Sequence, residues 1–268
     1  MITSNKIIKY VAIALALSLT VGITLFIITA ITQFGNIFIK SNSNENYEEI
    51  KTNTSFSILN IDVETINIVI KEGTNLKIET NNKYLKIEEK DDKVFITEKK
   101  HSIFKNDDSD LIIYVPDELI FDIVALESGA GRVNIEQLKT RKLDFDLGAG
   151  KVEINSLTVL TNAEIEGGAG TISINNAVIN DLELDLGVGK VDLTANLTGY
   201  NQINCGVGSS NINLIGSPTN YKIKVDKGIG NVALENEKIT NNTYYGTGNN
   251  IVDIDGGIGK IAINFKQQ

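Results

Sequence analysis

Hydrophobic and polar residues alternate along most of the chain after residue 50. In one segment, Leu143, Phe145 and Leu147 alternate with Asp144 and Asp146. A period of two places successive side chains on opposite sides of the backbone, which is typical of a β-strand with one buried face. The sequence after residue 50 shows neither helix-capping signals nor a helical apolar stripe, so the pattern predicts an all-β fold.

A Gly-x-Gly motif interrupts this alternation at regular intervals. Twenty of the 23 glycines follow residue 126, and the motif occurs seven times, with first glycines spaced by 19, 20, 19, 19, 22 and 29 residues. Glycines at such positions indicate a repeated structural device and not scattered flexibility. The glycine pairs are Gly129 and Gly131, Gly148 and Gly150, Gly168 and Gly170, Gly187 and Gly189, Gly206 and Gly208, Gly228 and Gly230, and Gly257 and Gly259.

Each repeat consists of a strand, a glycine corner, a second strand and a polar turn. This arrangement predicts a single-chain β-solenoid, or β-helix, in which each repeat of about 19–20 residues forms one coil. Equivalent residues of neighbouring coils would then stack about 4.8 Å apart, and the glycines would allow positive φ or a close approach of the backbone. An antiparallel up-and-down barrel is the alternative, although its hairpins would not need the same corner in every repeat.

The repeats occupy residues 126–268, whereas residues 54–125 keep the alternation without the glycine corner. We expect residues 54–125 to form irregular first coils or a hairpin-rich cap, because the end of a solenoid must be protected against edge-to-edge pairing. Pro116 is expected to end a strand within this cap.

The N-terminal region has a different character. No charged side chain lies between Tyr10 and Ile39, and residues 11–31 are almost wholly apolar or small. Because about 20 such residues span a bilayer as a helix, residues 1–40 are predicted to form a cytoplasmic tip and one transmembrane helix, followed by a short polar stalk at 41–53. Lys6 and Lys9 precede the apolar segment, so the N-terminus is expected in the cytoplasm and the C-terminal domain outside. The predicted localisation is the cell membrane, with a single pass.

A cleaved signal peptide is the alternative interpretation of this segment. Its apolar region would be shorter, about 7–15 residues, and a small-x-small cleavage site would follow. Here the apolar run is longer, and no clear cleavage site follows it.

The charge balance limits the possible partners. The chain has 25 basic and 34 acidic residues, and residues 1–40 hold three lysines and no acid, so the predicted exported part carries 22 basic and 34 acidic residues, a net charge of −12. Such a balance argues against nucleic acid as a partner. With one cysteine and one histidine, the chain has no disulfide framework and no His-pair metal site, and no cofactor is expected.

Acidic residues recur two positions before the first glycine of most corners, which would stack like charges on one another. One interpretation is a ladder of exposed salt bridges across the corner to the basic residues that follow the second glycine, Arg132, Lys151, Lys190 and Lys260. The other is a strip that binds divalent cations or a cationic polymer. The residues of this candidate cation strip are Asp146, Glu166, Asp185, Asp226 and Asp255.

Other candidate chemistry is weak. The sequence GAGK at 148–151 superficially resembles a phosphate-binding loop, but the strand pattern continues at Val152, so a structural corner is expected. Cys205 replaces a leucine of other copies and is predicted to be a buried apolar substitute. His101 lies in a charged loop without a second histidine. Paired carboxylates recur in several coils and do not mark one site, so no catalytic residue is predicted, and no enzyme.

The segment LIIYVPDELIFDIVALESGAG at 111–131, with the train of G-A-G and G-V-G coils after it, resembles the bacterial "putative adhesin" family of domains of unknown function. It is also similar to the related domains of Lia-type cell-envelope stress proteins. The resemblance covers roughly residues 50–268. It implies a membrane-anchored or exported β-solenoid and supplies no catalytic residues.

Two functions are therefore expected. The first is a non-catalytic, adhesin-like or envelope interaction module, whose partners besides the membrane are an unknown protein or an envelope polymer. The alternative is a regulatory protein that senses envelope stress and works through a membrane partner. No sequence feature selects the ligand.

Overall fold

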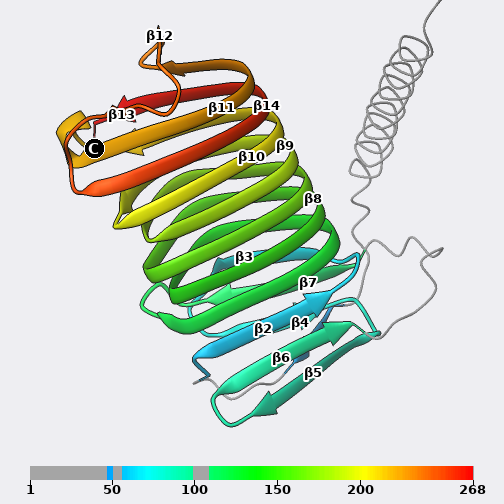
Figure 1. Ribbon diagram of the computed structural model, residues 1–268. Coiled ribbons are helices and arrows are strands. Elements are labelled where there is room, and N and C mark those ends of the chain that lie inside the picture. Colours follow the sequence, from blue (N-terminus) through cyan, green and yellow to red (C-terminus); the bar gives the residue numbers. More distant parts are fainter. Residues whose placement is uncertain (1–46, 51–55, 99–108, 268) are drawn as a thin grey trace, which may run out of the picture. The chain divides into compact units, whose positions relative to one another are not determined.

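The computed structural model describes residues 47–50, 56–98 and 109–267, which belong to the unit Asn46–Gln268 (Figure 1). The elements are β1 (Glu48–Ile50), β2 (Ile58–Val63), β3 (Asn67–Glu72), β4 (Lys77–Thr80), β5 (Leu85–Lys90), β6 (Lys93–Glu98), β7 (Asp110–Val115), β8 (Phe121–Asn180), β9 (Leu182–Thr198), β10 (Tyr200–Ile215), the 3-10 turn η1 (Pro218–Asn220), β11 (Tyr221–Leu234), β12 (Glu237–Lys238), β13 (Tyr244–Tyr245) and β14 (Asn250–Lys266).

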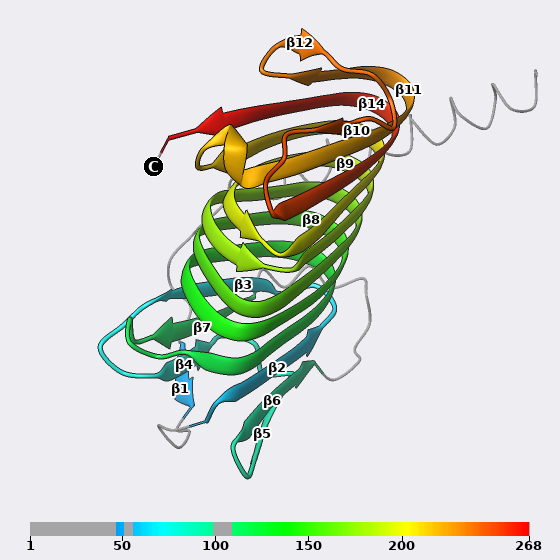
Figure 2. The same cartoon turned by 60° about the vertical axis from the view of Figure 1, so that its left-hand side comes forward.

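The chain winds into stacked coils that pair in parallel (Figures 1 and 2). β8 passes through three glycine corners without interruption, and β9, β10, β11 and β14 pass through one each. Every corner joins two extended segments, one before the glycines and one after them, so the solenoid has two faces. The predicted all-β solenoid is confirmed for the described residues.

The core fills the space between the two faces. Alternate side chains point inward, and equivalent positions lie in register from coil to coil, as for Ile165, Leu184, Ile203, Ile254 and Val225. All five are at most 1% exposed. Since burying one such side chain contributes about 1.5–3 kcal/mol, these stacked columns are the main source of stability.

The spatial order of the coils differs from their order in the sequence. β14 pairs with β10 on one side and with β11 on the other. The last coil of the chain therefore lies between two earlier coils, and β11 forms the end of the stack. The strands β12 and β13 pair antiparallel with β11 and cover parts of its outer edge (Figure 1).

At the opposite end, the coils are irregular. β2 and β3 pair in parallel with the first coil of β8, one on each face. β6 and β5 continue the sheet on one face, and β7, β4 and β1 continue it on the other. β7 ends at Val115, directly before Pro116, which lacks the N–H that a ladder needs.

Several predictions fall on other residues. The tip and transmembrane helix at 1–40, most of the stalk at 41–53, and His101 lie outside the described residues, and the domain boundaries stay predictions. Within the described residues, no helix has the length and apolar character that a membrane span requires.

Candidate interaction surfaces

The glycine corners stack with very close backbone contact. The second glycine of every corner has a φ between +143° and +156°, a region that favours glycine over residues with a Cβ. A Cβ on Gly170 would also lie closer than 3.0 Å to the carbonyl oxygen of Gly150 in the coil beneath. Both the backbone conformation and the coil spacing therefore require glycine here.

The outward side of the segments before the corners, which we call the acidic face, carries the residues of the predicted cation strip. Glu166, Asp185, Asn204, Asp255 and Asp226 lie in register in this order from coil to coil. Asp146 occupies the same position in the coil of Gly148, within β8.

Side-chain amides donate hydrogen bonds to some carboxylates of this column. The side-chain amide of Asn204 donates to Asp185, so the single asparagine of the column separates acidic residues. At the end of the stack, the amides of Asn241 and Asn242 donate to the Asp226 carboxylate over 2.9 and 3.1 Å. These contacts reduce the repulsion that stacked carboxylates would otherwise suffer.

Among the described residues, no side-chain amide donates a hydrogen bond to the Asp255 carboxylate. Burial raises the pKa of its carboxyl, and the negative charges of Asp253 and Asp226 raise it further, whereas Lys224 opposes them. The Lys224 ammonium lies 3.6 Å from an Asp253 carboxylate oxygen. Within the described residues, no group of three or more His, Cys, Asp or Glu side chains could hold a metal ion. The cation strip stays a prediction that a calorimetric titration with calcium would test.

Two of the basic residues after the corners, Lys151 and Lys190, pair differently from the predicted ladder. Lys151 binds Glu153 at 2.7 Å and Lys190 binds Asp192 at 2.5 Å, each along its own strand. Residues i and i+2 point to the same side of a strand, whereas the corner turns the acidic column onto the other face. The ion pairs of these two lysines thus contradict the predicted salt bridges across the corner.

The outward side of the segments after the corners, which we call the amide face, carries asparagine ladders. Asn175 donates to Asn155 of the preceding coil over 2.9 Å. Asn264 donates to Asn213 over 3.3 Å, and Asn213 donates to Thr194 over 3.3 Å. This face therefore presents repeated amide and hydroxyl groups with little net charge.

The edge between the two faces is apolar. It consists of the middle residues of the Gly-x-Gly motifs, which we call the corner ridge: Ala130, Ala149, Ala169, Val188, Val207, Ile258 and Ile229, in spatial order. The side chains grow from alanine to isoleucine toward the β11 end.

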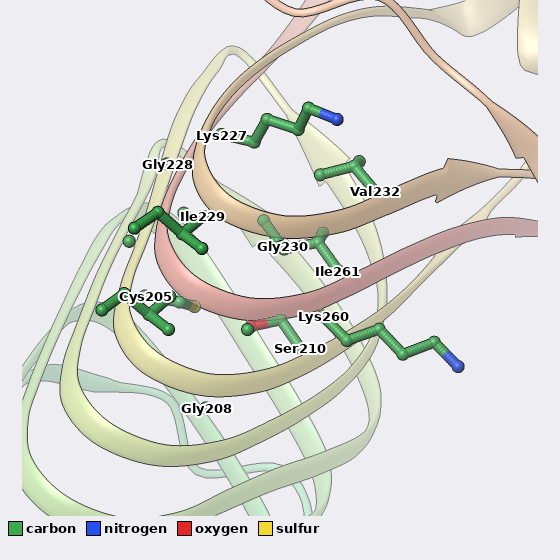
Figure 3. A pocket seen from close by; sticks show the side chains of 14 residues that line it. Cys205, Gly208, Ser210, Lys227, Gly228, Ile229, Gly230, Val232, Lys260 and Ile261 are labelled. Carbon is green, nitrogen blue, oxygen red and sulfur yellow. The ribbon is translucent and has the colours of Figure 1, made fainter.

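A small cavity of about 20 Å³ lies inside the corner near that end (Figure 3). Cys205 and Ser210 line it, in register with the larger Leu186 and Val191, and Gly256 lines it from the next coil. Such a volume has room for about one water molecule. Burial raises the pKa of the Cys205 thiol, which keeps it protonated and weakly nucleophilic.

A larger groove of about 830 Å³ lies at the β11 end, where η1 and the turn after β11 approach the end of β14. Leu234 and Phe265 supply its apolar lining, and Glu235, Glu237 and Lys266 supply its charged lining. The phosphate-loop interpretation of GAGK gains nothing from the fold, because Gly148–Lys151 continue within β8 and no helix follows.

These features define a class of protein: a parallel β-solenoid with stacked glycine corners, of the Toastrack type. The family model described as "Toastrack DUF4097" matches residues 56–250, and the chain belongs to this family. The likeness to the "putative adhesin" family that the sequence indicates is thereby confirmed.

Solved structures are also similar. A "putative cell adhesion protein" from Clostridium sporogenes shares 15% identity, with a TM-score of 0.37, over 83% of this chain and 100% of its own. A "putative adhesin" from Bacteroides fragilis shares 12%, with a TM-score of 0.34, over 83% and 98%. A "putative adhesin" from Parabacteroides distasonis shares 14%, with a TM-score of 0.41, over 82% and 96%. No curated protein matches the chain.

Reasoning from the sequence missed two features of these surfaces, the corner ridge and the insertion of the last coil. The ridge could have been found, because the middle residue of the motif changes from Ala to Val to Ile along the chain. The insertion has no comparable signal beyond the longer spacing before Gly257.

Proposed function

We propose that the chain is a non-catalytic, adhesin-like interaction module of the cell envelope, anchored in the membrane by its N-terminal segment, with the solenoid outside the cytoplasm. The observation that carries this proposal is the pair of broad, regular polar faces. Asparagine ladders repeat along one face and carboxylates along the other, at the coil spacing of about 4.8 Å.

An extended polymer is the ligand that suits such a surface. The repeated amides of the amide face can donate to and accept from the hydroxyls of an envelope polysaccharide, which also repeats along its length. The carboxylates recur from coil to coil and do not converge on one cleft, which supports binding over catalysis.

The binding proposal is tested with the full-length chain and insoluble bacterial cell-wall sacculi in a co-sedimentation assay. The variant Asn155→Ala/Asn175→Ala removes one hydrogen-bonded pair from the amide face, and we expect severalfold weaker retention. The control Asp144→Ala/Glu164→Ala alters the acidic face of the same two coils and should bind as the parent does. Equal retention of both variants, or no retention of the parent, would contradict the proposal.

The location is tested separately with a membrane-impermeant maleimide. In a Cys205→Ala background, Tyr200→Cys places a thiol at a half-exposed position, and labelling in intact cells is expected. Labelling only after lysis would place the solenoid in the cytoplasm.

The second candidate is regulation of envelope stress through a membrane partner, for which the length of the apolar segment 11–31 is the supporting feature. Replacing this segment with an unrelated apolar helix separates the two functions. An adhesin-like module keeps its retention on sacculi, whereas a regulator loses its effect on the stress response.

A further inference from the structure

The corner ridge is an exposed apolar line on a largely polar surface. Val188, Val207, Ile258 and Ile229 follow one another in register. Val207 is 45% exposed, Ile258 52% and Ile229 74%, so exposure increases toward the β11 end. Figure 3 shows Ile229 at the outer bend of the end coil. Apolar side chains aligned in this way often mark a contact surface.

Opposite charges flank the ridge. On the acidic-face side, each coil places Glu127, Asp146, Glu166, Asp185, Asn204, Asp255 or Asp226 beside it. On the amide-face side, the corresponding residues are Arg132, Lys151, Thr171, Lys190, Ser209, Lys260 and Asn231. Four coils thus carry an acid on one side and a base on the other, and the coil of Asn204 and Ser209 carries neither.

Part of this charge has no partner within the unit. Among the described residues, Lys260 forms no ion pair, and Figure 3 shows its side chain extending away from the corner. Asp255 meets other carboxylates on its own face. A cation supplied from outside would therefore be favourable beside Asp255.

The acidic and basic columns are complementary to those of a second copy of this chain, which is therefore the partner that we consider. A two-fold axis parallel to the stack brings two ridges into contact and turns the acidic column of each copy toward the basic column of the other. In this arrangement Asp255 faces Lys260 of the other copy, and Asp185 faces Lys190. A two-fold axis perpendicular to the stack would instead oppose acid with acid and base with base.

We propose that two copies of the chain associate side by side and parallel through their corner ridges, with the acidic column of each against the basic column of the other. Equivalent ridge residues then meet themselves, and the β1 ends of both solenoids point the same way. The contact consists of one line of side chains, whereas a stable complex typically buries roughly 800 Å² per partner. Association therefore depends on a high local concentration.

Cysteine cross-linking of the full-length chain in the producing cells tests this arrangement. In a Cys205→Ala background, Val188→Cys and Ile229→Cys are each produced alone and oxidised, and disulfide-linked dimers are expected from both. The two positions are three coils apart, roughly 14 Å, beyond the reach of a disulfide. When differently tagged Val188→Cys and Ile229→Cys chains are mixed, no mixed dimer is expected.

A charge exchange tests the complementarity. Lys260→Glu should reduce the cross-linked fraction of Ile229→Cys severalfold, and adding Asp255→Lys should restore it. Leu160→Cys, also about half exposed but outside the ridge, is the control and should not cross-link.

Three results would overturn the proposal. Mixed dimers without self-dimers would show an antiparallel contact. Ridge cysteines that stay monomeric would show that the ridge faces a lipid surface or another protein. Failure of the second substitution to restore cross-linking would show that the charges do not meet.

Discussion

Gly259 pairs in register with Gly208 on one side and with Gly230 on the other. The final coil is thus held between two coils that were formed earlier in the chain. A Cβ on Gly259 would overlap the carbonyl oxygen of Gly208, and the φ of Gly259 is +152°. The insertion therefore depends on a corner that only glycine can form.

Gly259→Ala is expected to destabilise the solenoid. Strain at the positive φ costs about 1–3 kcal/mol, and relief of the overlap adds to this. Asn231→Ala, at the exposed position after the neighbouring corner, should stay within about 0.5 kcal/mol of the parent. Urea unfolding of the full chain, followed by circular dichroism, measures both. Equal midpoints would show that the corner adjusts without cost.

The same contacts explain where the glycine column ends. A Cβ on each corner glycine points at the coil on the β2 side, as from Gly148 to Gly129 and from Gly131 to Ile66. Glu64 and Ile66 form the corresponding corner of the next coil without glycine. There the backbone N–H groups of Glu64 and Thr65 donate to the Glu98 carboxylate, over 2.8 and 3.3 Å, and not to another corner.

Glu98→Ala should therefore open this end of the stack. Losing the acceptor of two backbone N–H groups costs about 1–3 kcal/mol, and hydrogen exchange at Glu64 and Thr65 should become faster. Glu98→Gln, which keeps one oxygen acceptor, should show an intermediate rate. Glu88→Ala removes only the exposed ion pair with Lys86 and serves as the control. Unchanged exchange in Glu98→Ala would mean that water replaces the carboxylate without loss.

At the polar turns, Asn201 is fully buried at a position that other coils fill with apolar residues such as Val252. Its side-chain oxygen accepts from the Leu182 N–H, and its amide donates to the carbonyls of Thr198 and Ile251. Asn201→Leu removes one hydrogen-bond partner from each of these three backbone groups, although the Thr198 carbonyl still accepts from the Asp181 N–H. We expect a loss of roughly 1–3 kcal/mol for each group that is left without a partner.

The comparison variant for this site is Asn175→Ala, which removes an exposed amide from a hydrogen bond on the amide face. It should lower the melting temperature much less than Asn201→Leu. If the two variants have the same melting temperature, the buried amide network does not hold the turns in place.

Periodicity explains how much of this could be predicted. The alternation of Leu143, Phe145 and Leu147 fixes the inward face, and the recurrence of glycine fixes the corners, because both are local and repeated. Coil order is not local, because the glycine corner at Gly257 could stack on Gly206 or on Gly228. In the structure β12 and β13 pair with one edge of β11, and β14 lies between the other edge and β10. Likewise, Lys151 lies near acids on both sides of the corner, and only the direction of its strand selects Glu153.

The acidic face predicts a pH dependence that Asp255 dominates. Its pKa in the folded state is raised by burial and then by Asp253 and Asp226, so the folded protein binds this proton more tightly than the unfolded chain does. The unfolded chain has an ordinary carboxyl pKa of about 3.8 at this residue. As the pH rises from this value through the higher pKa of the folded state, stability is therefore lost. Asp255→Asn removes this loss, so its melting temperature should exceed that of the parent at pH 7 and approach it at pH 3. Salt at 1 M screens the charges of Asp253 and Asp226, so the part of the pH 7 difference that these charges cause should shrink. A difference that is independent of pH would show that Asp255 titrates as it does in the unfolded chain.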